Sequence, residues 1–535
     1  MRFAALSSLF TRTTKKPSRQ ARPPRHFRAF VDALERRELL AVLWVDNNPA
    51  NVAVHPADFT TISAAVAAAN PGDTIRVATG VAPYDENVLV DKPLTFLGGQ
   101  KRWFGELNTT TVREGTSSAA FTVQANNVTI SGFTITPQPT AVGGAEGIST
   151  DAPYSSLRVL NNTFTGNTLG IFLNSDGVLP NVVRNNKFIS NNLAGPATGN
   201  GIFSDLGLKN VVISHNTFTG HTTSSINLFG GPGALATPDE HSDIKILSNS
   251  IKNDSPIIAV NLTGSEISWN TISNPTHGDG ILLAGAVTET KVVGNKLTGN
   301  ATSGAGISVR VSDVASGGFF NVAHDVNGDP IPNSGLDIVD NEIYRWGESG
   351  IYLRDLTSDV YIAWNSASSN GTGSDPTVGD GISIADSSNI LLTKNTTVQN
   401  RRNGVYLNNS SLVTINWSTI GANGVDGIRL ENGSTQNLIT RVDVYHNGDF
   451  VAHTGNGVHL IDSSNNRVEW MSSNGNASDG ILVEGTSAGN VIRRNTAWNN
   501  YLYDLEDTTV GSGTAGTANT WYGNNAQKRS PAGLG

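Results

Sequence analysis

A short motif of an aspartate or asparagine, a glycine and a β-branched residue recurs along the chain. It reads GDGILL at 278–283, GDGISI at 379–384, VDGIRL at 425–430 and SDGILV at 478–483. A motif that returns every few tens of residues indicates a solenoid, because one repeat cannot bury its own apolar face and must stack on its neighbours.

A series of asparagines upstream of these motifs sets the length of the repeat. An apolar residue usually follows two places later, and the series is Asn162, Asn186, Asn216, Asn249, Asn270, Asn295, Asn341, Asn365, Asn395 and Asn495. Between the last two, our alignment puts Trp417, Arg441 and Trp470 in the same column. Successive members lie 21 to 33 residues apart, with one interval of 46, which predicts short coils with loop insertions.

Apolar residues alternate within each repeat, as in Ile281 with Leu283 and Ile382 with Ile384. Alternation over three to five residues is the period of a strand. Without helical stretches between the strands, the βα units of an open parallel sheet are excluded, and leucine is too sparse for leucine-rich repeats. We therefore predict a coil with about three short strands per turn, each pairing in parallel with the next coil.

Glycine and asparagine would supply the turns of this coil. Sharp turns need left-handed backbone, which glycine adopts freely and asparagine tolerates. In coils stacked ~4.8 Å apart, equivalent asparagines lie over one another. Because an amide both donates and accepts, we expect the asparagine column to bond as a ladder.

These marks resemble the right-handed parallel β-helix, and in particular the pectate-lyase-like and NosD-like repeat proteins, over residues 50–525. The expected fold class is all-β: a single-stranded, right-handed parallel β-helix solenoid with a short N-terminal capping helix. We assign 42–100 to the N-terminal cap and first coils, 101–507 to the parallel β-helix and 508–535 to a closing segment.

Both ends of the solenoid have candidate covers. A helix opening at Asp58 as its N-cap would bury Ile62, Ala65, Val66 and Ala69 on one face. This helix would cover strand edges that otherwise invite aggregation. At the other end, Trp521 would shield the last coil.

Residues 1–41 differ in charge from the rest and are predicted to be a disordered basic leader or targeting segment. Residues 1–37 hold ten Lys or Arg against Asp32 and Glu35, so the net charge of −9 for the whole chain leaves −17 for the remainder. Residues 34–41, LERRELLA, resemble the LEPR-type segment of large bacterial surface proteins, with Arg36 where that pattern has proline. The resemblance implies an extracellular or cell-surface location; an untargeted basic tail is the alternative.

Composition limits the partners. No apolar run reaches the ~20 residues of a membrane span, and an acidic body would repel the phosphates of a nucleic acid. The absence of cysteine excludes disulfides and thiolate chemistry. The sequence leaves the oligomeric state open.

Outward positions on the strand after the motif glycine form a column along the coils. Read in order, the column is Phe172, Phe203, Asn227, Asn261, Leu282, Ser308, Tyr352, Ser383, Tyr406, Arg429, His459 and Leu482. Two places further on come Arg310, Arg354, Asn408, Glu431 and Glu484. Rings stack on sugar faces and arginines bond carboxylates or hydroxyls.

We therefore expect an extended glycan to bind along this face, through Tyr352, Arg354, Tyr406, Arg429, Glu431 and His459. Exposed strand positions also favour Tyr and tolerate Arg, so a solvated strand face without a ligand is the alternative.

Catalytic candidates are fewer and rest on weaker patterns. The positions before the last motif glycines read Asp380, Asn403, Asp426, Asn456 and Asp479. Carboxylates one coil apart would repel, which explains the alternation without catalysis, but Asp380 and Asp426 remain candidates. His277 and Asp279 flank a turn and could together abstract a proton.

In lyases of the resembled fold, an Arg or Lys removes the proton α to a uronate carboxylate that calcium acidifies. Arg401 and Arg402, which enter a strand ending near Tyr406, are candidates for that role. No position matches a catalytic motif of the family.

Two insertions could carry function because long loops on a rigid scaffold often do. The first holds Asp239-Glu240-His241, a candidate acid/base cluster. The second holds Asp325, Asn327 and Asp329, with the spacing that opens a calcium loop, although Pro330 and Leu336 replace its usual glycine and glutamate.

Three functions remain open at this point. The first is an exported or cell-surface protein that binds polysaccharide along its strand face. The second is a polysaccharide lyase or uronate epimerase acting on an acidic glycan, with Ca²⁺ as its cofactor. The third is a purely structural surface protein or adhesin.

Overall fold

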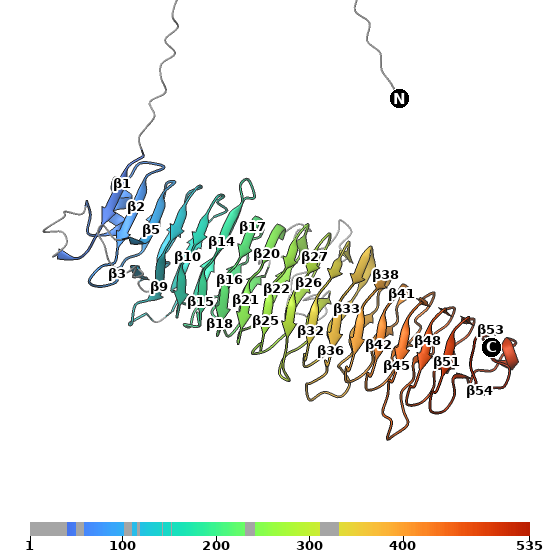
Figure 1. The fold of residues 1–535 in the computed structure, drawn as a ribbon. Helices are drawn as coiled ribbons and strands as arrows, with labels where there is room; N and C mark the ends of the chain where they lie inside the picture. The colour runs from blue at the N-terminus through green and yellow to red at the C-terminus, as the bar shows by residue number, and fades with distance from the viewer. Residues whose placement is uncertain are drawn as a thin grey trace, which may run out of the picture. The chain divides into compact units, whose positions relative to one another are not determined.

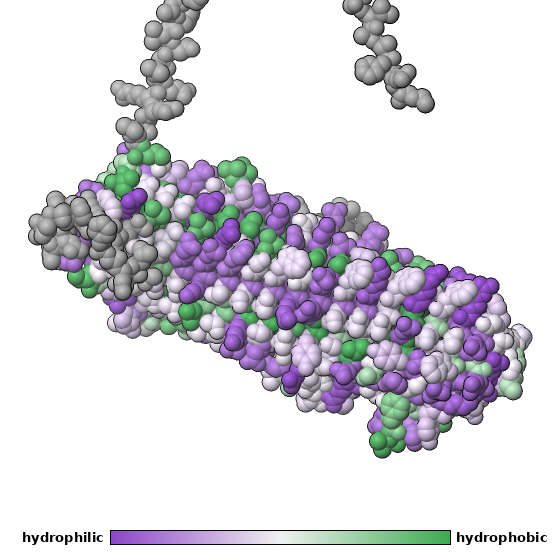
Figure 2. Space-filling model, viewed as in Figure 1, coloured by the Kyte–Doolittle hydropathy of each residue, from purple (hydrophilic) through white to green (hydrophobic). Residues whose placement is uncertain are grey.

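The computed structural model describes residues 40–49, 58–100, 110–114, 118–141, 143–150, 152–229, 241–310 and 331–535. The predicted leader therefore lies almost wholly outside the described residues. From Leu40 to Gly535 the chain forms one compact unit, in which coil stacks on coil from the blue end to the red end of Figure 1. The face of this unit seen in Figure 2 is largely hydrophilic, with hydrophobic residues scattered along it. Within the described residues, no helix combines the length and apolar character required to cross a membrane.

Three parallel sheets run along the solenoid, and each coil adds about one strand to each sheet. Sheet A runs from β1 (Val42–Val45) to β53 (Thr520–Tyr522), sheet B from β3 (Tyr84–Asp85) to β51 (Thr496–Trp498), and sheet C from β4 (Val88–Val90) to β54 (Arg529–Ser530). The predicted all-β parallel architecture is confirmed.

One coil shows how the chain passes between the sheets. It consists of β38 (Ser388–Thr393) in sheet A, β39 (Thr396–Val398) in sheet B and β40 (Val405–Asn408) in sheet C. The next coil repeats the order with β41 (Ser411–Asn416), β42 (Thr419–Gly421) and β43 (Ile428–Glu431), and each strand pairs in parallel with its counterpart. Equivalent residues of successive repeats therefore form continuous columns.

The core fills the interior of the coils with the residues that alternate along the strands. Ile281, Leu283, Ile382 and Ile384 are fully buried, as predicted. In the N-terminal half, aromatic rings share one column: Phe164 stacks on Phe188 with ring centroids 4.9 Å apart, and Phe188 on Phe218 at 4.7 Å. Repetition of one aromatic side chain in one column thus stacks ring on ring between successive coils.

The predicted asparagine ladder is present from Asn162 to Asn395. Each side-chain nitrogen donates to Oδ1 of the next asparagine, with N···O distances of 2.9–3.2 Å. Beyond Asn395 the alignment was wrong by one residue. The ladder position is taken by Ser418, Val442 and Met471, and Trp417, Arg441 and Trp470 stand immediately before it, with φ of 51°, 53° and 58°.

A second ladder occupies the turn from sheet B to sheet C and was missed in the sequence. Its side-chain bonds are 2.8–3.0 Å long and join Asn370, Asn400, Asn423, Asn447, Asn476 and Asn500. The signal was an asparagine three residues before the Asp/Asn-Gly pair in the coils that have no insertion at this turn, namely Asn400 before Asn403, Asn423 before Asp426 and Asn476 before Asp479.

The N-terminal helix, α2, spans Ile62–Ala68 and packs on β1, on β2 (Thr74–Ala78) and on β4, the first strand of sheet C. Its predicted buried face is confirmed, but the predicted N-cap is wrong. The cap is Thr61, and the Glu86 carboxylate from the following coil accepts the N–H groups of Ile62 and Ser63 at 2.8 Å. Asp58 instead accepts the N–H of Trp44 in β1 at 2.9 Å.

The last coil is closed as expected. Trp521 in β53 is buried, and its indole N–H donates to Asp507 at 2.7 Å.

Candidate functional site

The outward column of sheet C follows the predicted register. Strand pairing aligns Leu282, Ser308, Tyr352, Ser383, Tyr406, Arg429, His459 and Leu482. One member is corrected: Ile258 in β22 (Ile257–Val260) stands where Asn261 was predicted. Asn261 lies beyond the strand and is buried in a turn with left-handed backbone. The prediction misplaced it because this coil lacks the motif glycine from which the column was aligned.

Five of the predicted residues form one hydrogen-bonded network. Four of them lie on three successive strands, β40, β43 and β46 (Val458–Ile461), and Asp426 lies just before β43. The Tyr406 hydroxyl donates to Glu431, and Nε of Arg429 donates to the other oxygen of Glu431 at 2.6 Å. Nη1 of Arg429 donates to Asp426 at 3.1 Å.

His459 extends this network to a fourth strand. Nδ1 of His459 lies 3.1 Å from Asp426, and its Nε2 lies 3.0 Å from Glu484 of β49 (Ile481–Glu484). We call Tyr406, Asp426, Arg429, Glu431, His459 and Glu484 the sheet C network. Tyr406, Arg429, Glu431 and Glu484 are half-buried and keep an edge to solvent, whereas Asp426 is buried.

Protonation in the sheet C network follows from these contacts. Burial opposes the charge of Asp426 and of Glu431, but hydrogen bonds from His459 and Arg429 to Asp426, and from Tyr406 and Arg429 to Glu431, hold both pKa values below the ordinary range. Burial would lower the pKa of His459, but the hydrogen bond and charge of Asp426, with Glu484, raise it. Burial and the bond to Glu431 raise the pKa of the Tyr406 hydroxyl.

The alternating acids and amides that precede the motif glycines (Asp380, Asn403, Asp426, Asn456 and Asp479) form a hydrogen-bonded ladder of their own. Asn403 donates to Asp380 through its backbone (3.0 Å) and side chain (2.8 Å), and Asn456 donates to Asp426 in the same way (2.7 and 3.0 Å). The backbone N–H groups of Asp426 and Asp479 donate to the side-chain Oδ1 atoms of Asn403 and Asn456, respectively, in the preceding coil, each at 3.1 Å. An amide donor thus separates each carboxylate from the next.

The two candidate arginines hold a loop in place. Nη1 of Arg401 donates to the carbonyls of Gly373 (2.7 Å) and Asp375 (3.2 Å), and Nη1 of Arg402 donates to the carbonyl of Thr377 (2.6 Å). Arg402 also lies 3.6 Å from the carboxylate of Asp380, and its guanidinium stands 5.5 Å from the Tyr406 ring centroid. Arg402 therefore borders the sheet C network, whereas Arg401 is engaged by the backbone of the loop.

Tyr352 and Arg354 lie on the same face but outside the network, on β33 (Ile351–Arg354). Arg354 pairs with Asp386 at 3.1 Å. The Tyr352 ring carries the guanidinium of Arg310 at 5.6 Å from its centroid.

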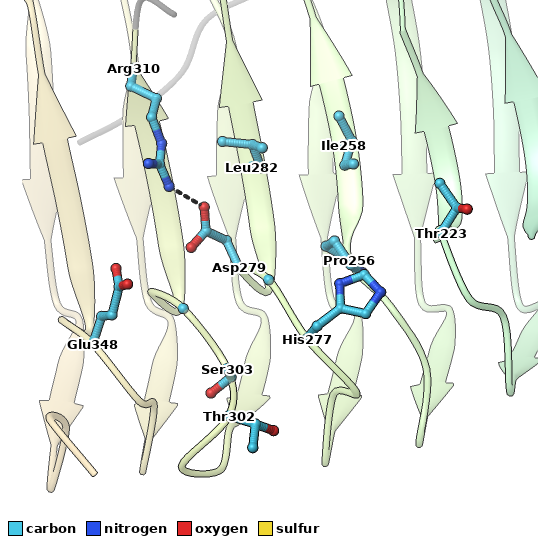
Figure 3. A pocket seen from close by; sticks show the side chains of 12 residues that line it. Thr223, Pro256, Ile258, His277, Asp279, Leu282, Thr302, Ser303, Arg310 and Glu348 are labelled. Carbon is cyan, nitrogen blue, oxygen red and sulfur yellow. Dashed lines mark hydrogen bonds and ion pairs between the residues drawn. The ribbon is translucent and has the colours of Figure 1, made fainter. Parts of the chain in front are cut away.

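A hollow of about 410 Å³ opens on the N-terminal side of Tyr352, lined by Asp279, Arg310, Glu348 and His277 among others. Figure 3 shows the ion pair between Arg310 and Asp279, with Glu348 on one side and His277 at the opposite end beside Pro256. His277 bonds the Thr222 carbonyl (2.9 Å) and the Ser255 hydroxyl (3.0 Å). No hydrogen bond joins His277 to Asp279, although both side chains line the hollow, and their joint role in proton abstraction stays a prediction.

Burial raises the pKa of the Glu348 carboxyl above its ordinary value, and the charge of Asp279 adds to the rise while Arg310 opposes it. Sequence reasoning missed Glu348 because it lies in a turn of irregular length, outside the column that the motif defines.

A comparison with protein families decides the classification. The model of the right handed beta helix region matches residues 98–237, 279–469 and 378–528, which is more than half of the chain. The chain belongs to the right-handed β-helix family.

Several solved structures resemble this β-helix protein at low identity. They include the A-module of mannuronan C-5 epimerase AlgE4 from Azotobacter vinelandii (13% identity, 81% of this chain and 88% of that chain, TM-score 0.34). They also include the enzymatically active domain of tailspike protein 2 from bacteriophage CBA120 (15%, 48% and 39%, 0.36). A periplasmic alginate epimerase, AlgG, matches at 10% identity over 78% and 76%, with a TM-score of 0.25.

Structural similarity at such low sequence identity and TM-score carries no information about the activity of this chain. No curated protein sequence matches the chain.

The predicted calcium ligands of this β-helix protein, Asp325, Asn327 and Asp329, lie outside the described residues. Elsewhere in the described part, no group of three or more His, Asp or Glu side chains is arranged to hold a metal ion. Of the other insertion, only His241 is described; it is buried in β20 (His241–Leu247), accepts the N–H of Leu208, and burial lowers its pKa to about 3. A buried, neutral imidazole of this kind belongs to the core and not to an acid/base cluster.

Proposed function

We propose that this β-helix protein acts at the cell surface or outside the cell and binds a polysaccharide along sheet C, between β33 and β49. The observation that carries the proposal is the run of phenol, guanidinium, imidazole and carboxylate groups on β40, β43, β46 and β49, which hold one another in place. Tyr406, Arg429, Glu431 and Glu484 keep polar edges exposed, and Tyr352 and Arg354 extend the same face on β33. Pre-oriented donors and acceptors of this kind bind a ligand with less loss of side-chain entropy. The basic leader before an acidic body supports export.

The charges of this surface favour sugar hydroxyls over uronates. Arg402, Arg429 and His459 face four carboxylates, those of Asp380, Asp426, Glu431 and Glu484. The positive groups are therefore already neutralised, and an added carboxylate would find no unpaired cation. A neutral glycan can instead donate hydroxyls to the carboxylates and accept from the free nitrogens.

The protonation states favour binding over catalysis at the sheet C network. A general base near neutral pH needs a pKa close to 7 and a free lone pair. The pKa values of Asp426 and Glu431 lie below the ordinary range, and that of Tyr406 is raised, so the carboxylates are weak bases and the phenol keeps its proton.

Affinity electrophoresis in gels that contain neutral glycans (β-glucan, xylan or galactomannan) tests this proposal. Retention by one of them should fall at least about tenfold in the Tyr352→Ala/Tyr406→Ala double variant, a loss typical of removing aromatic anchors. Tyr361→Ala, an outward tyrosine on β35 (Val360–Ala363) of sheet A, is the matched control. Unchanged retention of the double variant would reject the sheet C face, and no retention of the folded wild type in any gel would favour the purely structural function.

The hollow beside Tyr352 supports a second candidate, acid–base chemistry on a glycan. Glu348, whose carboxyl has a raised pKa, lines this hollow together with Asp279, whose carboxylate pairs with Arg310. Two carboxyls in such different environments are suited to proton transfer. Incubation with pectate, alginate and hyaluronan, with and without Ca²⁺, followed by absorbance of unsaturated products and by analysis of uronate epimers, tests this. Activity abolished by Glu348→Gln but not by Tyr406→Ala would establish it; no product from any of these glycans would eliminate a uronate substrate.

A further inference from the structure

Trp417, Arg441 and Trp470 occupy exposed positions of the turn from sheet A to sheet B, one residue before the asparagine ladder. The same turn position in neighbouring coils completes an alternating series: Trp364, Lys394, Trp417, Arg441, Trp470 and Arg494. We call these six residues the Trp/cation stripe. The three indoles are 55%, 58% and 49% exposed, so the stripe presents a large aromatic surface to solvent.

Each cation in the stripe lies against the ring of the preceding coil. Nζ of Lys394 is 4.2 Å from the centroid of Trp364, the Arg441 guanidinium is 5.2 Å from Trp417, and that of Arg494 is 4.8 Å from Trp470. Among the described residues none of these three cations has a carboxylate within ion-pair distance. The stripe is therefore a local concentration of unpaired positive charge on a body of net negative charge.

The backbone under the stripe is not the one that tryptophan prefers. All six residues have φ between 51° and 60°, the left-handed region, where Asn and Gly are favoured. Earlier coils place Asn161 and Asn185 at this same turn position. Strained backbone at exposed sites that offer no core packing points to a role outside folding.

The stripe borders a hollow of about 680 Å³ that is lined by Trp417 and Trp470 and also by Asp443, Ser472 and Thr496. The charged groups of the lining are the carboxylate of Asp443 and the guanidinium groups of Arg441 and Arg494. Even with Asp443 included, the hollow keeps a positive balance, and the sides of both indoles border it.

We infer that the Trp/cation stripe binds an extended anionic glycan, with one acidic group for every two sugars. Tryptophans recur every second coil, about 10 Å apart from the strand spacing, which is the order of length of one disaccharide in an extended β-linked chain. Each disaccharide would place one sugar against an indole and its carboxylate or sulfate against the next cation. The net charge of −17 on the chain after the leader repels an anionic ligand only weakly at the stripe, because exposed charges farther than about 8 Å away are screened at physiological salt.

This site differs from the proposed surface on sheet C in place and in chemistry, and does not depend on it. Single-stranded nucleic acid also stacks on aromatic residues flanked by cations. It carries a phosphate on every nucleotide, however, whereas the stripe offers a cation only in every second coil, a spacing that fits a more sparsely charged glycan.

Calorimetric titration of the full chain with hyaluronan oligosaccharides, which carry one carboxylate per disaccharide, tests the inference. The Trp417→Asn/Trp470→Asn double variant and the Arg441→Gln/Arg494→Gln double variant should each weaken binding at least about tenfold. Carboxyl-reduced hyaluronan of the same length should bind as weakly to wild type as hyaluronan binds to the arginine variant. Trp269→Asn is the matched control, because Trp269 has the same turn position and φ of 58° but lies over Gly294 without a cation.

Three outcomes would overturn the inference. The first is a wild type that binds neither hyaluronan nor an alginate oligomer, or a Trp double variant with wild-type affinity. The second is tighter binding of oligo(dT) than of hyaluronan, which would make the stripe a nucleic-acid site. The third is a melting temperature lowered by the Trp double variant but not by Trp269→Asn, which would make the stripe a device for stability. Because asparagine suits the left-handed turn, we expect folding of the Trp variant to be unaffected.

Discussion

Asn456 donates its side-chain amide to Oδ1 of Asp426 at 3.0 Å and its backbone N–H to the same oxygen at 2.7 Å. Its own Oδ1 accepts the backbone N–H of Asp479, at 3.1 Å. The amide thus separates two buried carboxylates that the register of the coils would otherwise bring into sequence.

The Asn456→Asp variant should be markedly less stable. The change removes the side-chain donor to Asp426 and places three acidic groups in adjacent coils of one buried column. A buried carboxylate left without a compensating partner costs about 3 kcal/mol or more. Urea unfolding at pH 7 measures the loss. Asn499→Asp, at an exposed left-handed turn, is the control and should change stability by no more than about 0.5 kcal/mol.

The asparagine ladder makes its own prediction at Asn295. This side chain donates to Asn341 (3.0 Å) and to the Ile267 carbonyl (2.9 Å) and accepts from Asn270 (3.0 Å). Asn295→Ala removes three side-chain hydrogen bonds from a buried column and should cost about 3 kcal/mol in the free energy of unfolding. A loss no larger than that of Ser250→Ala, an exposed serine on β21 (Ser250–Lys252), would contradict a cohesive role for the ladder.

The raised pKa of His459 predicts a dependence of stability on pH. The folded protein holds this proton more tightly than the unfolded chain, so the contribution of His459 is complete below the unfolded value of about 6.5 and is lost as pH rises through the folded pKa. His459→Gln should therefore cost about 2 kcal/mol at pH 6 and less at pH 9. Equal losses at both values would show that the imidazole is not protonated in the folded state.

Glu114, at the end of β6 (Thr110–Glu114), predicts the opposite trend. Its carboxylate oxygens are buried and have no hydrogen-bond partner among the described residues, and burial raises its pKa to about 7. Because the unfolded chain ionises first, this group makes the protein less stable as pH rises from about 4.5 to above 7. Glu114→Gln should add up to about 3 kcal/mol at pH 8 and little at pH 4, as measured by thermal or urea unfolding.

The residues that share a column were predictable because side chains alternate between the two faces of a strand. Once one residue of a strand is aligned with the next coil, the positions of the other residues of that strand follow. Tyr406, Arg429 and His459 fell into register from the glycine motif alone. The same reasoning failed at Asn261, where the coil has Ser-Pro in place of a motif glycine, and at Trp417, where the ladder asparagine is replaced by Ser418. In both coils the residue that defines the alignment was missing, the motif glycine in the first and the ladder asparagine in the second, so another residue was aligned in its place.

The contacts of the candidate site were less accessible to sequence reasoning. Which column faces outward depends on local alternation, but whether His459 reaches Asp426 depends on the stacking of three coils and on rotamers. Arg401 and Glu348 lie in turns of irregular length, where column position carries no information. The N-cap was misplaced for a similar reason, since the Glu86 carboxylate that stabilises the helix comes from a different coil.

The acid/amide column and the Trp/cation stripe alternate in phase. Each coil with a stripe tryptophan (Trp364, Trp417 or Trp470) also carries an aspartate before the motif glycine, and the coils with Lys394 and Arg441 carry an asparagine there. The unit that can be duplicated or deleted without a mismatch is therefore a pair of coils, 53 residues from Trp417 to Trp470. Removal of the single coil that carries Arg441 and Asn456 would set carboxylate on carboxylate and indole on indole at the new junction, whereas removal of two successive coils would leave both columns intact.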